Sequence, residues 1–164
     1  MAPRQMHLNA FLLGVGHHEA AWRLPASDPA AVTDAAHYRH LAQVAEQGTF
    51  DSVFLADKLS TGHAIRHNAV SVLEPTVLLG NIAAATDRIG LIATVSTSFN
   101  EPYNLARRLS SLDHISAGRA GWNIVTSYTD DEARNFGADT IEHHDLRYRR
   151  AREFVDLARA LWDS

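Results

Sequence analysis

Residues 118–127 have the sequence Gly-Arg-Ala-Gly-Trp-Asn-Ile-Val-Thr-Ser, an apolar run with a polar end. The apolar part is typical of a buried β-strand, and we expect Trp122 to lie in the core. Asn123, Thr126 and Ser127 place amide and hydroxyl groups where the run ends. In parallel α/β folds, ligands bind at the carboxyl ends of the strands. This stretch therefore predicts a strand of a parallel sheet and the edge of a binding site.

Three further apolar segments precede this strand, and a helical pattern follows each of the four. The predicted strands are His7–Gly14, Ser52–Ala56, Ile89–Val95 and the stretch above. They are apolar throughout instead of alternating with polar residues, which indicates a parallel sheet covered by helices. Consecutive βα units with right-handed crossovers predict an α/β fold, the N-terminal half of a (β/α)8 TIM barrel. A Gly-x-Gly-x-x-Gly sequence follows none of the strands, which weakens the dinucleotide-binding alternative.

The predicted helices carry apolar residues at helical spacing. The first runs from about Thr33 to Gly48, the second begins at Glu74-Pro75, and the third begins at Asn100-Glu101-Pro102. The fourth follows a predicted polar loop over residues 128–143. The expected buried residues are Val77, Leu78, Ile82 and Ala83 in the second helix, Leu105, Leu109 and Leu112 in the third, and Leu146, Phe154, Leu157, Ala158 and Leu161 in the fourth.

The length of the chain suits half a barrel. A whole barrel takes about 250 residues, whereas this chain has 164. An open half leaves two strand edges bare and a core unfinished. We therefore expect a single partial barrel domain over residues 1–164 that is the front part of a longer protein. The alternative is that two or more copies complete each other, and we expect a homo-oligomer.

The composition excludes several classes of function. A net charge of −4 gives no basic surface for nucleic acid. The dense group Arg147, Arg149, Arg150 and Arg152 is expected on the solvated face of a helix, which we favour over an anion site. The chain has no cysteine, which excludes disulfides, thiolate metal sites and cysteine nucleophiles. Neither a secretory leader nor an apolar run of about 18 residues is present, so we expect a cytoplasmic protein.

The strand ends and one helix start select the candidate site residues. His144 and Tyr148 lie four residues apart at the start of the last helix, so they share one side of it. The free N–H groups of that turn also favour a phosphate. The residues after the strands are His17 and His18; Asp57 and Lys58; Thr94, Ser96 and Thr97; and Asn123, Thr126 and Ser127.

Simpler structural explanations exist for several of these residues. Asp57 is equally expected to cap a turn, and Tyr148 to serve packing alone. The hydroxyl groups after the third strand lack the Gly-x-Ser-x-Gly frame of a hydrolase nucleophile. His63 and His67 have the spacing of metal ligands, but a third ligand is missing from the same loop, so we expect no metal site there.

Four segments resemble the luciferase-like flavin monooxygenases. Within that family they are similar to the branch of nitrilotriacetate monooxygenase component A, dibenzothiophene sulfone monooxygenase and long-chain alkane monooxygenase. The match covers nearly the whole chain in order. The segments are Met6-His7-Leu8-Asn9-Ala10-Phe11, Phe50-Asp51-Ser52-Val53-Phe54-Leu55-Ala56-Asp57, Asn100-Glu101-Pro102-Tyr103-Asn104-Leu105-Ala106-Arg107, and Leu112-Asp113-His114-Ile115-Ser116 running on into residues 118–127.

This resemblance implies an FMN-dependent oxidoreductase built on a barrel. Reduced FMN (FMNH2) would come from a separate NAD(P)H:flavin reductase. The flavin would form a C4a-peroxide with O2 and insert one oxygen atom into a small organic substrate. Members of the family exceed 400 residues, which implies that this chain is the N-terminal part of such a protein.

The resemblance also implies roles for individual residues. The implied flavin contacts are Asp57, Thr94 with Ser96 as the alternative, Asn123, His144 and Tyr148. His144 and Tyr148 match the pair that reaches the ribityl-phosphate. His17, or its neighbour His18, resembles the histidine over the reactive face of the flavin. The family's phosphate-binding serines of the second half of the barrel have no counterpart here, so we expect weak or absent FMN binding by this chain alone.

Two functions compete with the monooxygenase. A metal-dependent barrel hydrolase commonly needs a His-x-His pair at the end of the first strand, and here His17 and His18 are adjacent. A non-catalytic half-barrel that acts only by assembly is the other alternative.

Overall fold

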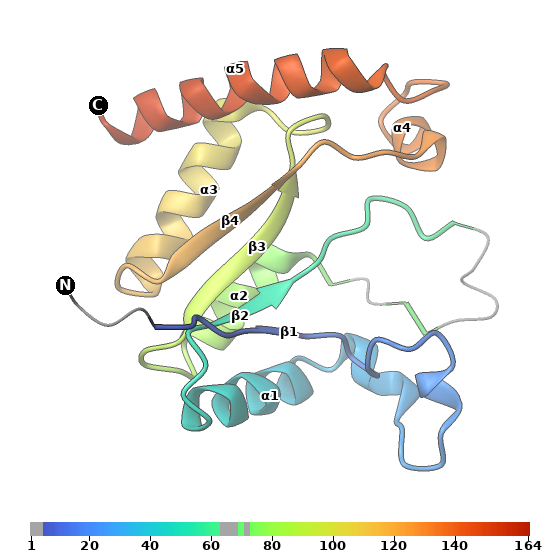
Figure 1. Cartoon of the computed structure of the whole chain (residues 1–164), viewed down its shortest axis with the longest axis vertical. Helices are drawn as coiled ribbons and strands as arrows, with labels where there is room; N and C mark the ends of the chain where they lie inside the picture. The colour runs from blue at the N-terminus through green and yellow to red at the C-terminus, as the bar shows by residue number, and fades with distance from the viewer. Residues whose placement is uncertain (1–4, 63–68, 71–72) are drawn as a thin grey trace.

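Four parallel strands form the centre of the molecule. The computed structural model describes residues 5–62, 69–70 and 73–164. In the described residues the sheet has the order β1-β2-β3-β4, the order in which the strands occur in the chain. The strands are β1 (Asn9–Phe11), β2 (Ser52–Leu55), β3 (Gly90–Ser96) and β4 (Ala120–Val125). This arrangement confirms the predicted half-barrel of consecutive βα units, although β1 is shorter than the predicted strand (Figure 1).

The helices follow the strands as predicted. They are α1 (Ala35–Gln47), α2 (Pro75–Ala83), α3 (Pro102–Ile115), α4 (Asp130–Asn135) and α5 (His144–Trp162), with short 3-10 helices at Ala21–Arg23 and Pro29–Thr33. Proline occupies the first turn of α2 and α3, where its missing N–H costs no helical hydrogen bond. Asp34 caps α1 by accepting a hydrogen bond from the N–H of Ala36 at 2.8 Å. Helices α1, α2 and α3 pack on β2, β3 and β4 respectively, and α5 lies against α3 (Figure 1).

The core lies between the sheet and these helices. Leu91, Ala93 and Val95 of β3 point into it together with Leu79 and Ile82 of α2. Because side chains alternate along a strand, the intervening residues point to the opposite face of the sheet. There Phe54, Ile92 and Asn123 are only half-buried. That face carries the polar residues of the candidate site.

Some predicted details of the helices are wrong. Val77 is 74% exposed, because α2 is turned so that Leu78, Leu79, Ile82 and Ala83 face the core. Leu146 and Leu157 are exposed on α5, whose buried residues are Ala151, Phe154 and Ala158. The predicted loop over residues 128–143 contains the short helix α4.

Trp122 of β4 lies at the edge of the core, where its ring packs near Phe154 and its Nε1 donates to the carbonyl of Val95 at 3.0 Å.

The amino ends of the strands are held by charged side chains bonded to main-chain groups. We call this edge the amino pole. Arg119 donates to the carbonyls of Ser116 (2.7 Å), Ile89 (3.0 Å), Ala83 (3.0 Å) and Thr86 (2.9 Å). It thereby joins the ends of α2 and α3 to the starts of β3 and β4.

A second clamp at the amino pole is the carboxylate of Glu46. Its Oε1 accepts hydrogen bonds from the N–H groups of Asp87 (3.0 Å), Arg88 (2.6 Å) and Ile89 (2.9 Å). These three groups form the turn into β3, so Glu46 fixes that turn to the end of α1.

Gly14 marks a close approach between the loop after β1 and the segment before α1. A Cβ atom at Gly14 would lie 2.6 Å from Cα of Val32 and 3.0 Å from the hydroxyl oxygen of Tyr38. A larger residue therefore requires backbone movement here, and glycine fixes the loop against that segment.

Candidate functional site

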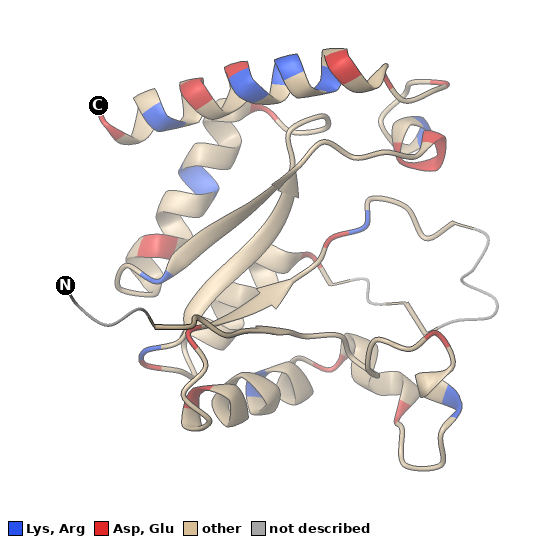
Figure 2. Ribbon diagram, in the orientation of Figure 1, with Lys and Arg blue, Asp and Glu red and all other residues tan. Residues whose placement is uncertain are grey.

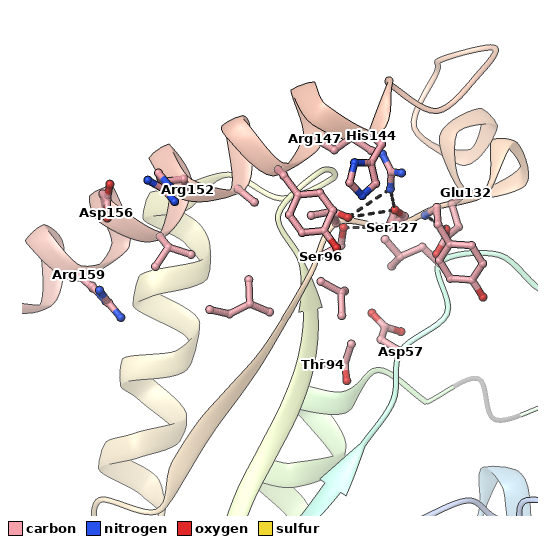
Figure 3. Close-up of a pocket in the computed structure, with 18 residues that line it drawn as sticks. Asp57, Thr94, Ser96, Ser127, Glu132, His144, Arg147, Arg152, Asp156 and Arg159 are labelled. Atoms are coloured by element: carbon pink, nitrogen blue, oxygen red, sulfur yellow. Dashed lines mark hydrogen bonds between the residues drawn. The ribbon is translucent and has the colours of Figure 1, made fainter.

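A cavity of about 800 Å³ lies at the carboxyl ends of the strands, which we call the carboxyl pole (Figure 3). Its volume falls in the range typical of small-molecule and cofactor sites. The predicted site residues that line this cavity are Asp57, Thr94, Ser96, Thr126, Ser127, His144 and Tyr148. They come from the ends of β2, β3 and β4 and from the start of α5, so the topology gathers residues that are far apart in the chain.

Asn123 lies beside these residues without lining the cavity. It pairs with Thr94 in the ladder between β3 and β4, and its Nδ2 donates to Thr94 Oγ1 at 3.0 Å. Both side chains therefore belong to the face opposite the helices. The amide of Asn123 orients the Thr94 hydroxyl that reaches the cavity.

Hydroxyl groups connect the ends of β3 and β4. The hydroxyls of Ser96 and Ser127 are 2.8 Å apart, and the Ser98 hydroxyl donates to the carbonyl of Thr126. Thr97 Oγ1 donates to the carbonyl of Val125 at 3.1 Å. Ser127 is buried and has a φ of 54°, a left-handed conformation that is uncommon for a residue with a side chain. The end of β4 is thus held in a strained turn by cross-strand contacts.

Asp57 has an unusual electrostatic environment. Burial raises the pKa of its carboxyl group, and the nearby charges of Glu74 and Glu132 raise it further. The N–H of Lys58 and the charge of Arg108 oppose this rise but do not cancel it. Asp57 therefore keeps its proton to a higher pH than an exposed aspartate, and in that form it can donate a hydrogen bond.

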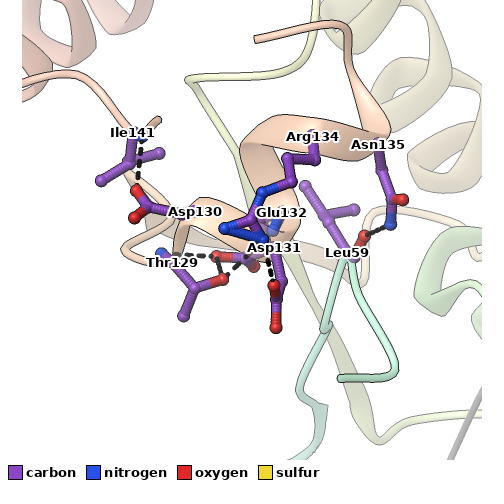
Figure 4. Close-up of polar contacts among 8 residues, drawn as sticks. All are labelled: Leu59, Thr129, Asp130, Asp131, Glu132, Arg134, Asn135 and Ile141. Atoms are coloured by element: carbon purple, nitrogen blue, oxygen red, sulfur yellow. Dashed lines mark hydrogen bonds and ion pairs between the residues drawn. The ribbon is translucent and has the colours of Figure 1, made fainter. Parts of the chain in front are cut away.

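Glu132 contributes a buried carboxylate to the cavity wall that the sequence analysis did not identify. It forms a capping box with Thr129: Glu132 Oε2 accepts from the N–H of Thr129 at 3.2 Å, and the Glu132 N–H donates to Thr129 Oγ1 at 3.2 Å (Figure 4). Asn135 then donates to the carbonyl of Leu59 at 2.8 Å. Helix α4 thus ties the loop after β4 to the loop after β2. The Thr-x-x-Glu spacing was the available signal for this helix.

Arg147 also differs from its predicted place on a solvated face. Its side chain is half-buried in the cavity wall, where Nη1 donates to the Ser127 carbonyl and to Thr126 Oγ1 at 3.3 Å. Arg149 and Arg150 are exposed, in agreement with the prediction, whereas Arg152 is exposed but lines the cavity. Along α5 the arginines from Arg147 to Arg152 form one basic group, which is flanked by Asp145 on one side and by Glu153 and Asp156 on the other (Figure 2).

The structure does not bring His17 and His18 into the cavity. Both are exposed in the loop after β1. The His17 ring meets Phe11 edge-on at 5.2 Å, and His18 Nδ1 accepts a hydrogen bond from the N–H of Ala20 at 3.1 Å. Their predicted catalytic role stays a prediction, as do the flavin contacts of the cavity residues.

The described part of the chain has neither a clustered metal site nor a helix suited to crossing a membrane. His63 and His67 lie outside the described residues. Among residues 5–62, 69–70 and 73–164, no cluster of three histidine or acidic side chains is arranged to hold a metal ion. In the same residues, no helix combines the length and apolar character needed to cross a membrane.

Comparison with known proteins agrees with the geometry. The family model described as luciferase-like monooxygenase matches residues 15–164. N-acetyl-S-(2-succino)cysteine monooxygenase of Bacillus subtilis is 47% identical over 98% of this chain and 36% of its own length. Nitrilotriacetate monooxygenase component A of Aminobacter aminovorans is 41% identical over 99% of this chain and 39% of its own length. Dibenzothiophene-sulfone and long-chain alkane monooxygenases are further relatives.

Solved structures of monooxygenases and of a riboflavin lyase are also similar to this chain. EDTA monooxygenase of Chelativorans sp. BNC1 superposes with a TM-score of 0.89 at 37% identity, over 97% of this chain and 38% of its own. A riboflavin lyase crystallised with modified FMN has a TM-score of 0.85 at 31% identity, over 97% of this chain and 38% of its own. The chain thus spans little more than a third of the length of these relatives.

Proposed function

This chain belongs to the luciferase-like monooxygenase family, and from that membership we propose that it forms the N-terminal half-barrel of an FMNH2-dependent monooxygenase. The enzyme inserts one oxygen atom of O2 into a small organic substrate. The observation that carries the proposal is the convergence of Asp57, Thr94, Ser96, His144 and Tyr148 on one cavity at the carboxyl pole.

The side chains present suit a flavin mononucleotide. The first turn of α5 has no side-chain cap from His143, so its N–H groups are available to a phosphate. Beside that turn lie His144, Tyr148 and the guanidinium of Arg147, whose Nε is buried without a partner among the described residues. At the other end of the cavity, Asp57 and the Thr94 hydroxyl supply the donors and acceptors that a flavin ring edge requires.

In this proposal the residues of the chain bind and orient the cofactor. Reduced FMN, when bound, supplies the electrons that activate O2. His144, Tyr148 and the α5 N-terminus hold the phosphate end. Asp57, Thr94 and Asn123 orient the ring, with Ser96 near the Thr94 position. His17 or His18, which lie outside the cavity in the half-barrel, would move a proton once the cofactor and the rest of the barrel are in place.

The enzyme depends on a partner protein for its reduced flavin. Reduced flavin comes from a separate NAD(P)H:flavin reductase, in line with the name "component A" of one relative. The remainder of the barrel is supplied by residues beyond those of this chain, in line with the share of each relative that it covers.

The test uses the complete product of the reading frame that encodes this chain. Purified under anaerobic conditions, it is titrated with FMNH2, binding is followed by isothermal titration calorimetry, and the complex is then mixed with O2. We expect one-to-one flavin binding and, with a reductase present, substrate-dependent O2 consumption. If the complete product does not bind flavin, the proposed function is wrong.

A second titration addresses the 164-residue chain by itself. We expect weak or absent FMN binding, because barrel phosphate sites usually draw on the loops after the seventh and eighth strands. Tight one-to-one binding at micromolar FMN would contradict this expectation. It would show that the carboxyl pole of the half-barrel is sufficient for the cofactor.

A further inference from the structure

We infer that Arg147 is a positioning residue, which locks the first turns of α5 to the carboxyl end of β4 and so places His144 and Tyr148 in the cavity. The importance of that placement for the cofactor rests on the proposed function. The mechanical coupling itself rests only on contacts within this chain.

The contacts of Arg147 join two elements that are connected in the chain by residues 128–143, which include the short helix α4. Nη1 of Arg147 donates to the carbonyl of Ser127 and to Thr126 Oγ1 at 3.3 Å. Ser127 is in turn bound through its hydroxyl to Ser96 of β3 at 2.8 Å. The side chain of Arg147 therefore connects α5 to the ends of both β4 and β3 (Figure 3).

Arg147 is the side chain that anchors the start of α5. Of residues 144–150, all of which the structure describes, it alone is not exposed. The next buried residue is Ala151, from which the helix packs onto the core. Because His143 provides no side-chain cap, the first turns have few other means of being held. Without Arg147 they would be free to fray.

The two candidate ligand-binding residues flank this anchor. His144 and Tyr148 lie on either side of Arg147 in the helix, and their rings are 4.6 Å apart. Both line the cavity although both are exposed. Their direction is therefore determined by the orientation of the helix turn, which depends on Arg147.

The hydrogen bond from Arg147 to the Ser127 carbonyl also supports the left-handed backbone of Ser127. Its left-handed backbone, with a φ of 54°, is strained and needs support from its surroundings. Arg147 supplies that support at the carbonyl, and Ser96 supplies it at the hydroxyl. Both contacts come from Nη1 of the rigid, planar guanidinium, so a lysine ammonium on its differently shaped, flexible stem should replace them only in part.

The first experiment measures amide hydrogen exchange in the ligand-free protein. R147M is compared with R150M, a matched change at an exposed arginine of the same helix. We expect exchange of residues 126–128 and 143–149 to be roughly tenfold faster in R147M, with α3 unchanged, because a hydrogen bond to a charged group is lost. R147K should lie between R147M and the wild type. Equal exchange in R147M and R150M would overturn the coupling.

The second experiment measures FMN affinity of the complete product of the reading frame. We expect R147M to bind FMN roughly tenfold more weakly and R147K to recover part of the loss, at an unchanged melting temperature. If exchange changes but FMN affinity equals that of R150M, Arg147 does not position the site. If the wild type binds no FMN, the proposed function fails, while the exchange result still decides whether Arg147 couples the two elements.

Discussion

The two poles of the sheet use their charged side chains differently. At the amino pole, Arg119 donates to main-chain carbonyls at the ends of α2 and α3 and at the start of β3, and Glu46 accepts from three consecutive N–H groups of the turn into β3. At the carboxyl pole, Asp57 has a raised pKa, Arg147 keeps a buried unpartnered Nε within the described structure, and Ser127 is strained. The first arrangement stabilises the fold, whereas the second leaves polar groups available to a ligand at some cost in stability.

The largest expected effect is at the amino pole. In R119M the carbonyls of Ser116, Ile89, Ala83 and Thr86 lose their shared donor. We expect a loss of about 3 kcal/mol in the free energy of unfolding and a melting temperature lower by about 10 °C. The measurement is thermal unfolding followed by circular dichroism. R107M, at an exposed position of α3, is the control. Equal melting temperatures for the two variants would contradict the structural role of this pole.

Glu46 gives an intermediate effect with a defined pH dependence. Burial opposes ionisation of Glu46, but the N–H groups of Arg88, Ile89 and Asp87, together with the charge of Arg88, lower its pKa below 4.5. The ionised carboxylate therefore stabilises the fold above pH 4.5, and this contribution is lost as the pH falls through the lower folded-state pKa.

The variant E46Q tests this clamp. We expect a loss of about 1.5 kcal/mol in the free energy of unfolding at pH 7, measured by urea titration. The difference from the wild type should shrink at acid pH, where Glu46 of the wild type becomes protonated. E153Q, at an exposed position of α5, should change neither quantity. A difference that stays constant with pH would mean that the charge of Glu46 is not involved.

Substitution of Asp57 should change the free energy of unfolding least, and it should raise it, whereas R119M and E46Q lower it. Because the folded state raises the pKa of Asp57, its ionisation destabilises the fold progressively as the pH rises from 3.8 through the folded-state pKa. D57N removes that penalty. We expect the free energy of unfolding at pH 7 to rise by roughly 0.5 kcal/mol, while FMN binding by the complete product weakens. D139N, at an exposed position, is the control. If D57N is destabilised, Asp57 stabilises the fold, as Arg119 and Glu46 do at the amino pole.

The sequence was sufficient to predict the fold and part of the cavity lining, but not Glu132 or Arg147. Apolar strands and Pro75 and Pro102 at helix starts are local signals that were confirmed in place, whereas the strand-end rule selected residues that line the cavity as well as His17 and His18, which do not. Recognition of the family agreed with them. The role of each cavity residue stays a prediction, because cofactor contact has not been measured.

The contacts that the sequence did not reveal are mostly long-range. Glu46 binds N–H groups more than 40 residues further along the chain, and Arg147 binds a carbonyl 20 residues before it. Such pairs leave no periodic pattern, so Arg147 resembled its exposed neighbours. Val77 was misplaced for a related reason, since a helix with apolar residues on several sides does not specify which side faces the sheet.

Gly14 has a consequence for protein engineering. The close approach of Gly14 to Val32 and Tyr38 fixes the base of the segment that carries His17 and His18. Residues 17–27 of that segment are exposed or half-buried, so they form a cassette that can be exchanged between homologues without remodelling the sheet. Gly14, Val32 and Tyr38 would have to be transferred together with any new backbone at the base. Loop libraries should therefore randomise residues 19–27 and leave Gly14, Val32 and Tyr38 unchanged, together with His17 and His18.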